Sequence, residues 1–312
     1  MITGRAFAKI NLILKVFDKR PDNYHNIFSL IHKVSLHDII KISANKKGDI
    51  DVECDVDLGI SPEENIVFKA AIALQEYTKC NKPARIKIEK IIPTGAGLGG
   101  GSSDAATTLK LLNQFWNLKL GIKNLYEIAT TLGSDVPFFL NDYPQWVYGR
   151  GEYCDVLDLI DMNKNNNFIR RHLAATGIIV YPKIHIDTSL AYKKLNRGIG
   201  TAITNNDTYL KNIVHYEELI ERNQNIFLAS NMLKNDFEEI IFEMYPEIAD
   251  LHSCLSGLFK KRVRLTGSGS AIFMLFTDKN KYMTSNYAKT FLRRKFKEEG
   301  KDYQVFRVLL LP

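Results

Sequence analysis

The sequence predicts an α/β protein that folds as two domains, and three observations support this. Residues 5 to 17 alternate between apolar and mostly polar side chains, which is typical of a strand. A second strand pattern, over residues 85 to 92, leads through a glycine-rich loop into a helical pattern that reaches Trp116. The chain has 312 residues, which is enough for two domains.

Composition and charge narrow the class of protein. Hydrophobic residues make up 45% of the chain and charged residues 25%, as in soluble globular proteins. The net charge of +7 comes from scattered basic residues, so it suits an anionic small substrate better than a nucleic acid. The four cysteines lie far apart without a C-x-x-C motif, which fits a reducing cytosol. With no signal-like or membrane-spanning apolar run, we expect a cytoplasmic protein without a nucleic-acid or membrane partner.

The first half of the chain alternates strand patterns with helices. Lys9 and Asn11 lie on the same face of the first strand, because alternate residues of a strand point the same way. Residues 61–64, Ser-Pro-Glu-Glu, form a capping box that predicts a helix reaching Tyr77. The other expected features are a polar turn at 18–23, an apolar stretch at 27–31, and a hairpin that joins 38–43 to 50–54 across 45–48.

The second half continues with further strands and helices. The expected helices cover residues 121–132, 216–222, 236–242 and 282–296, with another that reaches Cys254. The expected strands cover 146–154 with a turn, 178–186, 262–266, 271–276 and 304–311. Residues 161–167 are polar and rich in asparagine, so we place a domain boundary there and divide the chain into 1–160 and 161–312.

The glycine-rich loop between residues 93 and 103 is the strongest functional signal. Five glycines in the seven residues from Gly95 to Gly101 let the backbone bend freely. A helix follows, for which Ser102 or Ser103 is a suitable N-cap. A strand, a glycine loop and a helix N-terminus together predict a phosphate site, since unpaired N–H groups and the helix dipole both favour an anion.

Other phosphate loops fit this stretch less well. Gly95, Gly97 and Gly100 match G-x-G-x-x-G, but no acidic residue lies between Asp104 and Glu127, where the dinucleotide fingerprint needs one. No lysine follows the glycines, as a Walker loop requires, and the glycine loop of protein kinases lies on a hairpin instead of before a helix. A glycine-rich turn without a ligand would lose backbone entropy with nothing to offset the loss.

The remaining pattern, P-x3-G-L-G-G-G-S-S-x-A-A, resembles the ATP loop of the GHMP kinases, which act on small molecules. Further segments resemble the branch that phosphorylates 4-diphosphocytidyl-2-C-methyl-D-erythritol. In chain order they are Ala8 to Leu12, Tyr24-His25, Gly133 to Phe139, Asn235 to Glu238 and Thr266 to Ser270. The resemblance implies an α/β (α+β) fold of two GHMP domains, with ATP in the N-terminal domain and the active site in the cleft between domains.

The activity implied by the resemblance is transfer of the ATP γ-phosphoryl group to the substrate's 2-hydroxyl, in the non-mevalonate isoprenoid pathway. Lys9 would stabilise charge and Asp135 would accept or orient the hydroxyl proton. Mg²⁺ would bridge phosphate oxygens, and no protein ligand is assigned to it beyond the suggestion of Ser103. The residues implied for ATP are Pro93, Thr94, Gly95, Ala96, Gly97, Leu98, Gly99, Gly100, Gly101, Ser102, Ser103 and Asn65. Those implied for the cytidyl substrate are Asn11, Tyr24, His25, Tyr192 and Lys193, in a monomer or weak dimer.

Simpler interpretations of single residues remain open from the pattern alone. Ser134-Asp135 before Pro137 is good helix-cap chemistry, and a lone lysine such as Lys9 is most often exposed on a strand. Tyr24 and Tyr192 could be packing residues, and His25 a surface histidine.

The whole chain also has alternative functions. It could be another GHMP kinase of the homoserine or mevalonate type, or a GHMP protein that binds a ligand without catalysis. It could also be a basic RNA-binding protein, although no RRM-type aromatic signature is present.

Overall fold

A computed structural model describes residues 1–46, 48–157, 175–198, 206–223, 233–259, 263–277 and 280–311. The domain boundary expected at 160/161 and the polar stretch 161–174 therefore lie outside the described residues. The chain forms two compact units. Unit 1 comprises Met1–Ala8, Leu36–Thr94 and Gly99–Asp142; unit 2 comprises Lys9–Ser35, Gly95–Leu98 and the described residues from Tyr143 onward. Each unit is described by itself.

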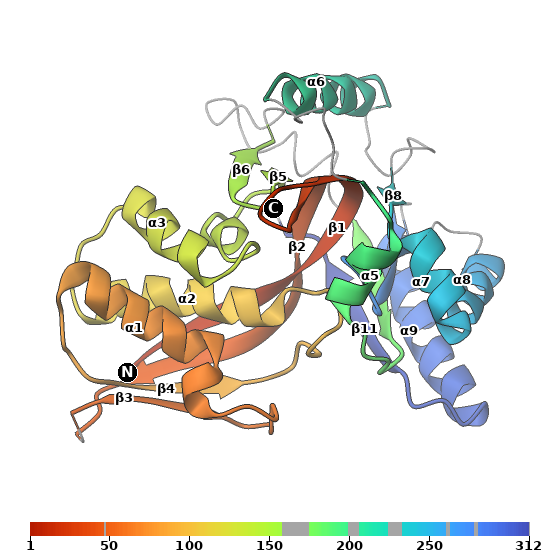
Figure 1. The fold of residues 1–312 in the computed structure, drawn as a ribbon. Coiled ribbons are helices and arrows are strands. Elements are labelled where there is room, and N and C mark those ends of the chain that lie inside the picture. Colours follow the sequence, from red (N-terminus) through yellow and green to blue (C-terminus); the bar gives the residue numbers. More distant parts are fainter. Residues whose placement is uncertain are drawn as a thin grey trace. The chain divides into compact units, whose positions relative to one another are not determined.

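Unit 1 combines strands with three packed helices. Its elements are the start of β1 (Ile2–Lys19), the end of β2 (His25–Ser43), β3 (Ile50–Cys54), the 3-10 helix η1 (Pro62–Glu64), α1 (Ile66–Thr78), β4 (Ala84–Glu89), α2 (Gly100–Phe115), α3 (Ile122–Leu132) and the 3-10 helix η2 (Pro137–Leu140). Helices α1, α2 and α3 pack against one another, and α1 also contacts β3 (Figure 1). Alternate residues of β4, Ala84, Ile86 and Ile88, are buried, which confirms the alternating pattern of that segment.

The hairpin expected between residues 38–43 and 50–54 is wrong, because β4 lies between β2 and β3. β4 runs antiparallel to β2 and parallel to β3. The side chain of Arg85 on β4 forms ion pairs with Asp51 and Glu53 of β3 at 3.3 and 2.9 Å. A short polar gap between two strand patterns indicates a turn, but it does not indicate that a later strand inserts between them.

The two predicted helix starts in unit 1 are both shifted. The Ser61 capping box is present, but it caps η1, and α1 is capped by Asn65, whose Oδ1 accepts the N–H of Val67 at 2.9 Å. The N-cap expected at Ser102 or Ser103 is wrong, since α2 begins at Gly100 with Gly99 as its cap. The N–H of Ser103 already donates to Gly99 O at 2.9 Å, so this serine lies inside the helix.

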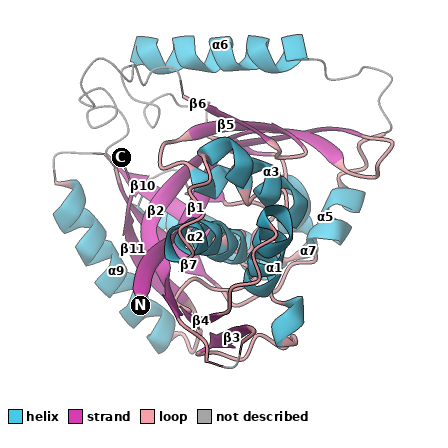
Figure 2. Ribbon diagram, turned by 90° about the vertical axis from the view of Figure 1, so that its left-hand side faces the viewer, coloured by secondary structure: helices cyan, strands magenta, loops and turns pink. Residues whose placement is uncertain are grey.

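Unit 2 contains a four-stranded antiparallel sheet and most of the remaining helices. Its sheet order is β11-β7-β10-β9, and Figure 2 shows α9 beside β11. The elements are β5 (Gln145–Gly149), β6 (Tyr153–Val156), β7 (Thr176–Tyr181), α5 (Thr188–Lys194), α6 (Asn206–Asn223), β8 (Lys234–Asn235), α7 (Glu238–Met244), α8 (Pro246–Phe259), β9 (Val263–Leu265), β10 (Ile272–Phe276), α9 (Lys281–Glu298) and β11 (Gln304–Leu309), with the adjoining parts of β1 and β2. The predicted strand-and-turn segment at 146–154 corresponds to the β5–β6 hairpin.

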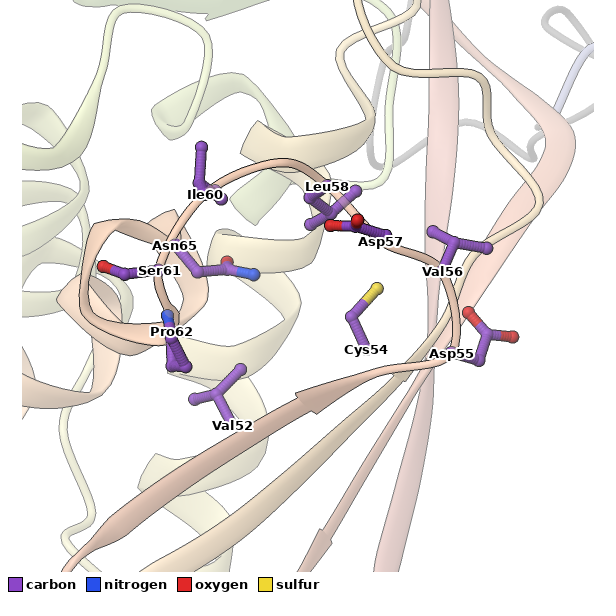
Figure 3. Close-up of a pocket in the computed structure, with 10 residues that line it drawn as sticks. All are labelled: Val52, Cys54, Asp55, Val56, Asp57, Leu58, Ile60, Ser61, Pro62 and Asn65. Carbon is purple, nitrogen blue, oxygen red and sulfur yellow. The ribbon is translucent and has the colours of Figure 1, made fainter.

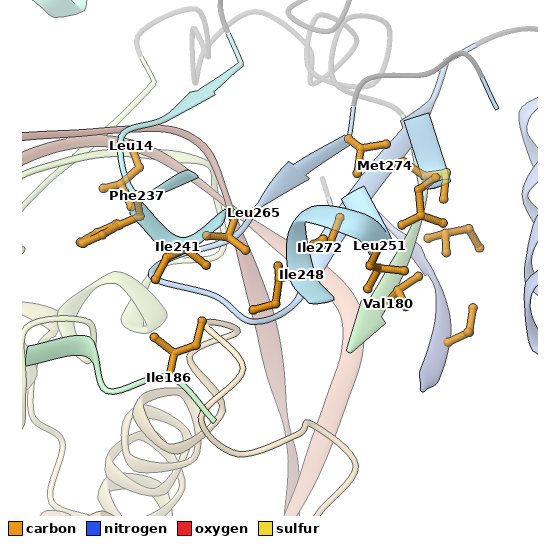
Figure 4. Packing of buried hydrophobic residues seen from close by; sticks show 14 of the residues in the cluster. Leu14, Val180, Ile186, Phe237, Ile241, Ile248, Leu251, Leu265, Ile272 and Met274 are labelled. Carbon is orange, nitrogen blue, oxygen red and sulfur yellow. The ribbon is translucent and has the colours of Figure 1, made fainter. Parts of the chain in front are cut away.

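The hydrophobic core of unit 2 fixes the turn between β9 and β10. Phe237 and Leu265 are 1% and 0% exposed and lie in one cluster with Leu14 and Ile241 (Figure 4). Leu265 pairs with Ile272 at the base of the turn, so apolar packing holds both of its ends. All four cysteines are described and each is a free thiol. None of the described helices has the length and apolar character needed to cross a membrane.

Within unit 2, the first half of the glycine loop packs on this turn. Ala271 N donates to Ala96 O at 3.2 Å, and the Thr266 hydroxyl donates to Gly97 O at 3.2 Å. Gly97 has a φ of +74°, and a Cβ at this position would lie 2.1 Å from Thr266 O. The close approach of two backbones therefore requires glycine here.

Replacement of Gly97 by alanine should destabilise the protein more than the same change at a glycine in open space. Gly59 has a φ of +68° with nothing within 4 Å, so Gly59→Ala tests the backbone strain alone, about 1–2 kcal/mol. Gly97→Ala adds the clash with Thr266 O, so we expect at least twice that loss of the free energy of unfolding in urea titrations. Equal losses in the two variants would contradict the packing of the loop on the turn.

Candidate active site

Lys9 and Asn11 form a buried pair on β1 in unit 2. Both are 4% exposed, and Lys9 Nζ donates to Asn11 Oδ1 at 2.6 Å. The same Oδ1 accepts the N–H of Gly267 at 2.9 Å, and Asn11 Nδ2 donates to the Ser29 hydroxyl at 2.9 Å. Asn11 thus has its amide orientation fixed from several sides, and the lysine ammonium it holds is fixed with it. Exposure of Lys9 on the strand, the simpler interpretation, is wrong.

The turn that contacts Asn11 is braced by the segment Asn235 to Glu238. Asn235 Nδ2 donates to the carbonyl oxygens of Leu265 and Gly267 at 2.9 and 2.8 Å. Glu238 Oε1 accepts the N–H of Leu265 at 2.9 Å, and burial raises the pKa of Glu238. Both Gly267 and Asn235 belong to segments that carried the family resemblance. The resemblance implied that the Gly267 turn lies near the phosphates, whereas Asn235 was given no role.

In unit 1 the N-terminus of α2 offers donors to an anion. Its cap, Gly99, makes no side-chain hydrogen bond, and the first turn contains no acidic residue. Gly95, Gly97 and Gly99 all have positive φ, at +66°, +74° and +69°. The first amides of a helix lack partners within the helix, so uncapped amides and the helix dipole suit a phosphate group. Of the other loop residues expected to bind ATP, Thr94 and Gly101 are exposed and Pro93 and Ser102 half-buried, whereas Ala96, Leu98 and Ser103 are 1% exposed.

A pocket of about 370 Å³ lies in unit 1 between the end of β3 and the start of α1 (Figure 3). Its lining is Val52, Cys54, Asp55, Val56, Asp57, Leu58, Ile60, Ser61, Pro62 and Asn65. Asn65 is the only one of these that sequence reasoning placed at the nucleotide. Burial, with the nearby charges of Asp55 and Asp104, raises the pKa of the Cys54 thiol. No motif marked the rest of the lining, because it belongs to an irregular segment.

Asp135 lies half-buried in the turn that follows α3. The cap of η2 is Val136, and this cap makes no side-chain hydrogen bond. The N-cap position of that short helix is thus one residue beyond Asp135. Gly133 is the C-cap of α3, as expected.

The residues expected to bind the cytosine differ in their contacts and in their exposure to solvent. His25 stacks on Tyr192 with ring centroids 5.0 Å apart and an angle of 20° between planes. Tyr192 also meets Phe237 edge-on at 4.8 Å, which ties it to the core. Tyr24 is 54% exposed, with the Arg150 guanidinium 5.3 Å from its ring centre, and Lys193 is exposed at the end of α5. Burial and the charge of Lys19 lower the pKa of His25, so its ring is neutral at neutral pH.

No metal centre built from protein side chains is found in the described part of the chain. Groups of three or more histidine, cysteine, aspartate or glutamate residues that could hold an ion are absent from it.

Comparisons with known proteins identify the family of the chain. Residues 65–142 match the model of the GHMP kinases N terminal domain and residues 216–282 that of the GHMP kinases C terminal. A 4-diphosphocytidyl-2-C-methyl-D-erythritol kinase of Thermodesulfovibrio yellowstonii is 40% identical over 281 residues, 89% of this chain and 91% of the relative. One of Syntrophus aciditrophicus is 34% identical over 88% of this chain and 89% of the relative.

Solved structures agree with these relatives. A crystal structure of 4-(cytidine 5'-diphospho)-2C-methyl-D-erythritol kinase superposes with a TM-score of 0.73 and 26% identity, covering 100% of both chains. The Methanococcus jannaschii mevalonate kinase, at 15% identity and a TM-score of 0.62, shares the fold, covering 100% of this chain and 98% of its own. The predicted fold class and the small-molecule kinase activity are confirmed. The chain belongs to the 4-diphosphocytidyl-2-C-methyl-D-erythritol kinase family of the GHMP kinases.

Proposed function

We propose that this chain transfers the γ-phosphoryl group of ATP to the 2-hydroxyl of 4-diphosphocytidyl-2-C-methyl-D-erythritol. The observation that carries the proposal is the buried Lys9, whose ammonium Asn11 holds at 2.6 Å. A lysine is rarely buried, since desolvation of its charge is unfavourable, so a buried ammonium fixed beside a glycine-rich turn points to charge stabilisation in a reaction. The names of the relatives indicate which reaction.

The nucleotide would use two features of unit 1. The uncapped amides of α2 would bind its phosphates, and the pocket beside Asn65 would receive its base. Asn65 already uses its Oδ1 to cap α1, so its backbone and side-chain amide are held in place at the pocket wall. The volume of about 370 Å³ falls in the range of small-molecule sites.

Mg²⁺ fits this arrangement as a companion of the nucleotide. The ion would be held mainly by phosphate oxygens and water, and the hydroxyl of Ser103 in the first turn of α2 is the protein group we suggest beside it. When bound, the ion would supply charge neutralisation at the phosphates.

Lys9 and Asp135 are the residues that we assign to the chemical step. Phosphoryl transfer requires little covalent chemistry from the protein and depends on positioning and on electrostatic stabilisation. The Lys9 ammonium would stabilise the charge that develops on the transferred group and on the attacking oxygen. The Asp135 carboxylate would accept or orient the hydroxyl proton.

The cytidyl end of the substrate would be bound in unit 2. His25 and Tyr192 form a stacked pair whose outer faces can extend the stack onto a cytosine ring. A neutral His25 has one ring nitrogen that donates and one that accepts, so it can recognise the amino group of cytosine. Tyr24, Asn11 and Lys193 complete the substrate-binding residues of the proposal.

A phosphoryl-transfer assay tests the proposed function directly. Purified protein with ATP and Mg²⁺ should phosphorylate the cytidyl substrate with a kcat/KM at least ~100-fold above that for homoserine or mevalonate, because a site built around polar base contacts rejects ligands that leave them unpaired. Comparable rates on mevalonate or homoserine would shift the assignment to another GHMP kinase.

Loss of either proposed catalytic group should lower kcat. Lys9→Met and Asp135→Asn should each reduce kcat by ~100-fold or more with little change in KM, since the lost interactions belong to the transition state. Lys15→Met is the matched control, because Lys15 lies on the same face of β1 and also donates to an asparagine, Asn212, at 3.1 Å. Asp142→Asn serves the same purpose for Asp135. A variant that raises KM alone would lose its catalytic assignment.

Removal of the stacked tyrosine should weaken binding of the nucleobase. Tyr192→Ala and Tyr24→Ala should each weaken CMP binding by about tenfold or more, while ATP binding is spared, since base stacking is worth roughly 1–3 kcal/mol.

Tyr192→Phe keeps the ring and should bind CMP normally. Tyr153→Ala is the control for an exposed tyrosine, because Tyr153 is 53% exposed and stacks on Tyr148. His25→Ala should reduce the preference for CMP over UMP. Equal CMP affinity in all variants, measured by calorimetry, would place the base elsewhere.

A further inference from the structure

Unit 1 contains a buried group of one lysine and two aspartates that the proposed reaction does not use. Lys90 Nζ lies 2.5 Å from Asp38 Oδ2 and 2.9 Å from Asp104 Oδ2. The side chains of Lys90, Asp38 and Asp104 are 6%, 0% and 4% exposed. We call these three residues the Lys90 cluster.

The Lys90 cluster connects the two segments that border the glycine loop. Lys90 follows the last residue of β4, and Asp38 Oδ1 accepts the N–H groups of Ile91 and Ile92 at 2.6 and 2.8 Å, just before Pro93. Asp104 lies on α2, five residues after its cap Gly99. One ammonium therefore joins the chain leading into the loop to the helix that leaves it.

The backbone of Lys90 is fixed as well, to the wall of the pocket. Lys90 N donates to Asp55 Oδ1 at 2.9 Å, and Asp55 lines the pocket beside Asn65. A Cβ on Gly100, the first residue of α2, would lie 3.1 Å from Lys90 Nζ, so the ammonium reaches the very start of the helix. Lys90 thus links the pocket to the helix N-terminus through one residue.

The charges of the cluster argue against a role in stability alone. Two buried carboxylates face one ammonium, and Asp104 Oδ1 has no hydrogen-bond partner. Burial, together with the charge of Asp38, raises the pKa of Asp104 to about 7. Apolar side chains of similar volume often stabilise a fold more than a buried ion pair does, whereas a buried ion pair fixes geometry.

We propose that Lys90 and Asp104 are positioning residues. They hold the N-terminal amides of α2 at a set distance from the pocket beside Asn65, so that a single ligand contacts both the amides and the pocket. This inference rests on the proposed function, in which the α2 amides bind the nucleotide's phosphates. Because Asp38 and Asp104 neutralise its charge, Lys90 does not act on the ligand directly. It acts by positioning α2 and the chain that leads into the glycine loop. The expected ligand preference is for a nucleoside that carries phosphates over the bare nucleoside.

Calorimetry with ATP and with adenosine on four proteins tests this inference. Asp104→Ala removes the ion pair between Lys90 and α2. This variant should therefore bind ATP at least tenfold more weakly than the parent, while it binds adenosine as the parent does. Asp104→Asn keeps an oxygen that can accept from Lys90 and should stay within about threefold of the parent. Lys41→Met is the matched control, because Lys41 on β2 forms an ion pair with Glu89 on β4, the residue before Lys90. This variant should bind both ATP and adenosine as the parent does.

Each outcome of this experiment decides the inference. A purely structural role would lower the stability of Asp104→Ala but leave the ratio of ATP to adenosine affinity unchanged, and that result overturns it. Equal weakening of ATP and adenosine overturns it too. If the parent itself fails to bind ATP, the proposed function falls with it. Should Asp104→Ala not fold, the double variant Lys90→Met, Asp104→Leu is measured instead and should show the same selective loss of ATP affinity. It removes one carboxylate together with the ammonium, and Asp38 keeps the N–H groups of Ile91 and Ile92 as donors.

The pH dependence of stability gives a second readout on the same variants. A raised folded-state pKa means that folded Asp104 keeps its proton where the unfolded chain has lost it, so the stability that Asp104 contributes at pH 4 declines as the pH rises to about 7. Lys90 and Asp38 face this carboxyl, and Cys54 lies within reach of its charge. Asp104→Asn should lack this decline in urea titrations between pH 4 and 7. A decline as steep as the parent's would show that Asp104 does not titrate as a member of the cluster.

Discussion

The hydrogen bonds of the Asn11 side chain are the interaction on which the site in unit 2 depends. Its carbonyl oxygen accepts both the Lys9 ammonium and the N–H of Gly267, and its amide nitrogen donates to Ser29. Because the amide is buried, any partner that moved away would leave a polar group unsatisfied, and that penalty holds the set together. One asparagine thereby fixes a cation and a glycine turn in the same place.

This constraint explains why the recognisable segments of the chain are short and far apart. The middle of β1, the first half of the glycine loop and the β9–β10 turn each contribute a few polar groups, and these groups satisfy one another. Asn235 braces the turn from behind through two carbonyl oxygens. Four segments are needed because no single strand or loop can saturate its own buried backbone. The glycines occur where two backbones must approach, as at Gly97 and Thr266 O.

The sequence alone was sufficient for the features that local pattern determines. The alternation of β4, the helix of α2 and the glycine loop follow from periodicity and backbone freedom, and the family resemblance led to Lys9 and Asn11. The hairpin at 38–54 failed because parallel pairing of β3 with β4 joins residues more than 30 positions apart, which no local pattern reports. The N-cap failed because burial of Ser103 inside the helix overrides its preference for a cap. Nothing local distinguished Lys90 from a surface lysine.

Lys9 and Lys90, two of the lysines with buried side chains, differ in the groups that orient their ammonium. Lys90 meets two carboxylates, whose charges raise its pKa against the opposing effect of burial, and the cluster as a whole carries no positive charge outward. The ammonium of Lys9 donates to the carbonyl oxygen of Asn11 at 2.6 Å, so a neutral amide takes part in orienting it. The ammonium of Lys90 is oriented by two carboxylates, one on β2 and one on α2. Strong pairing of this kind resists displacement of the strand end from the helix, because either carboxylate would be left buried and unpaired if the ammonium moved away. Pairing with carboxylates from two elements is therefore the physical basis for assigning Lys90 to geometry.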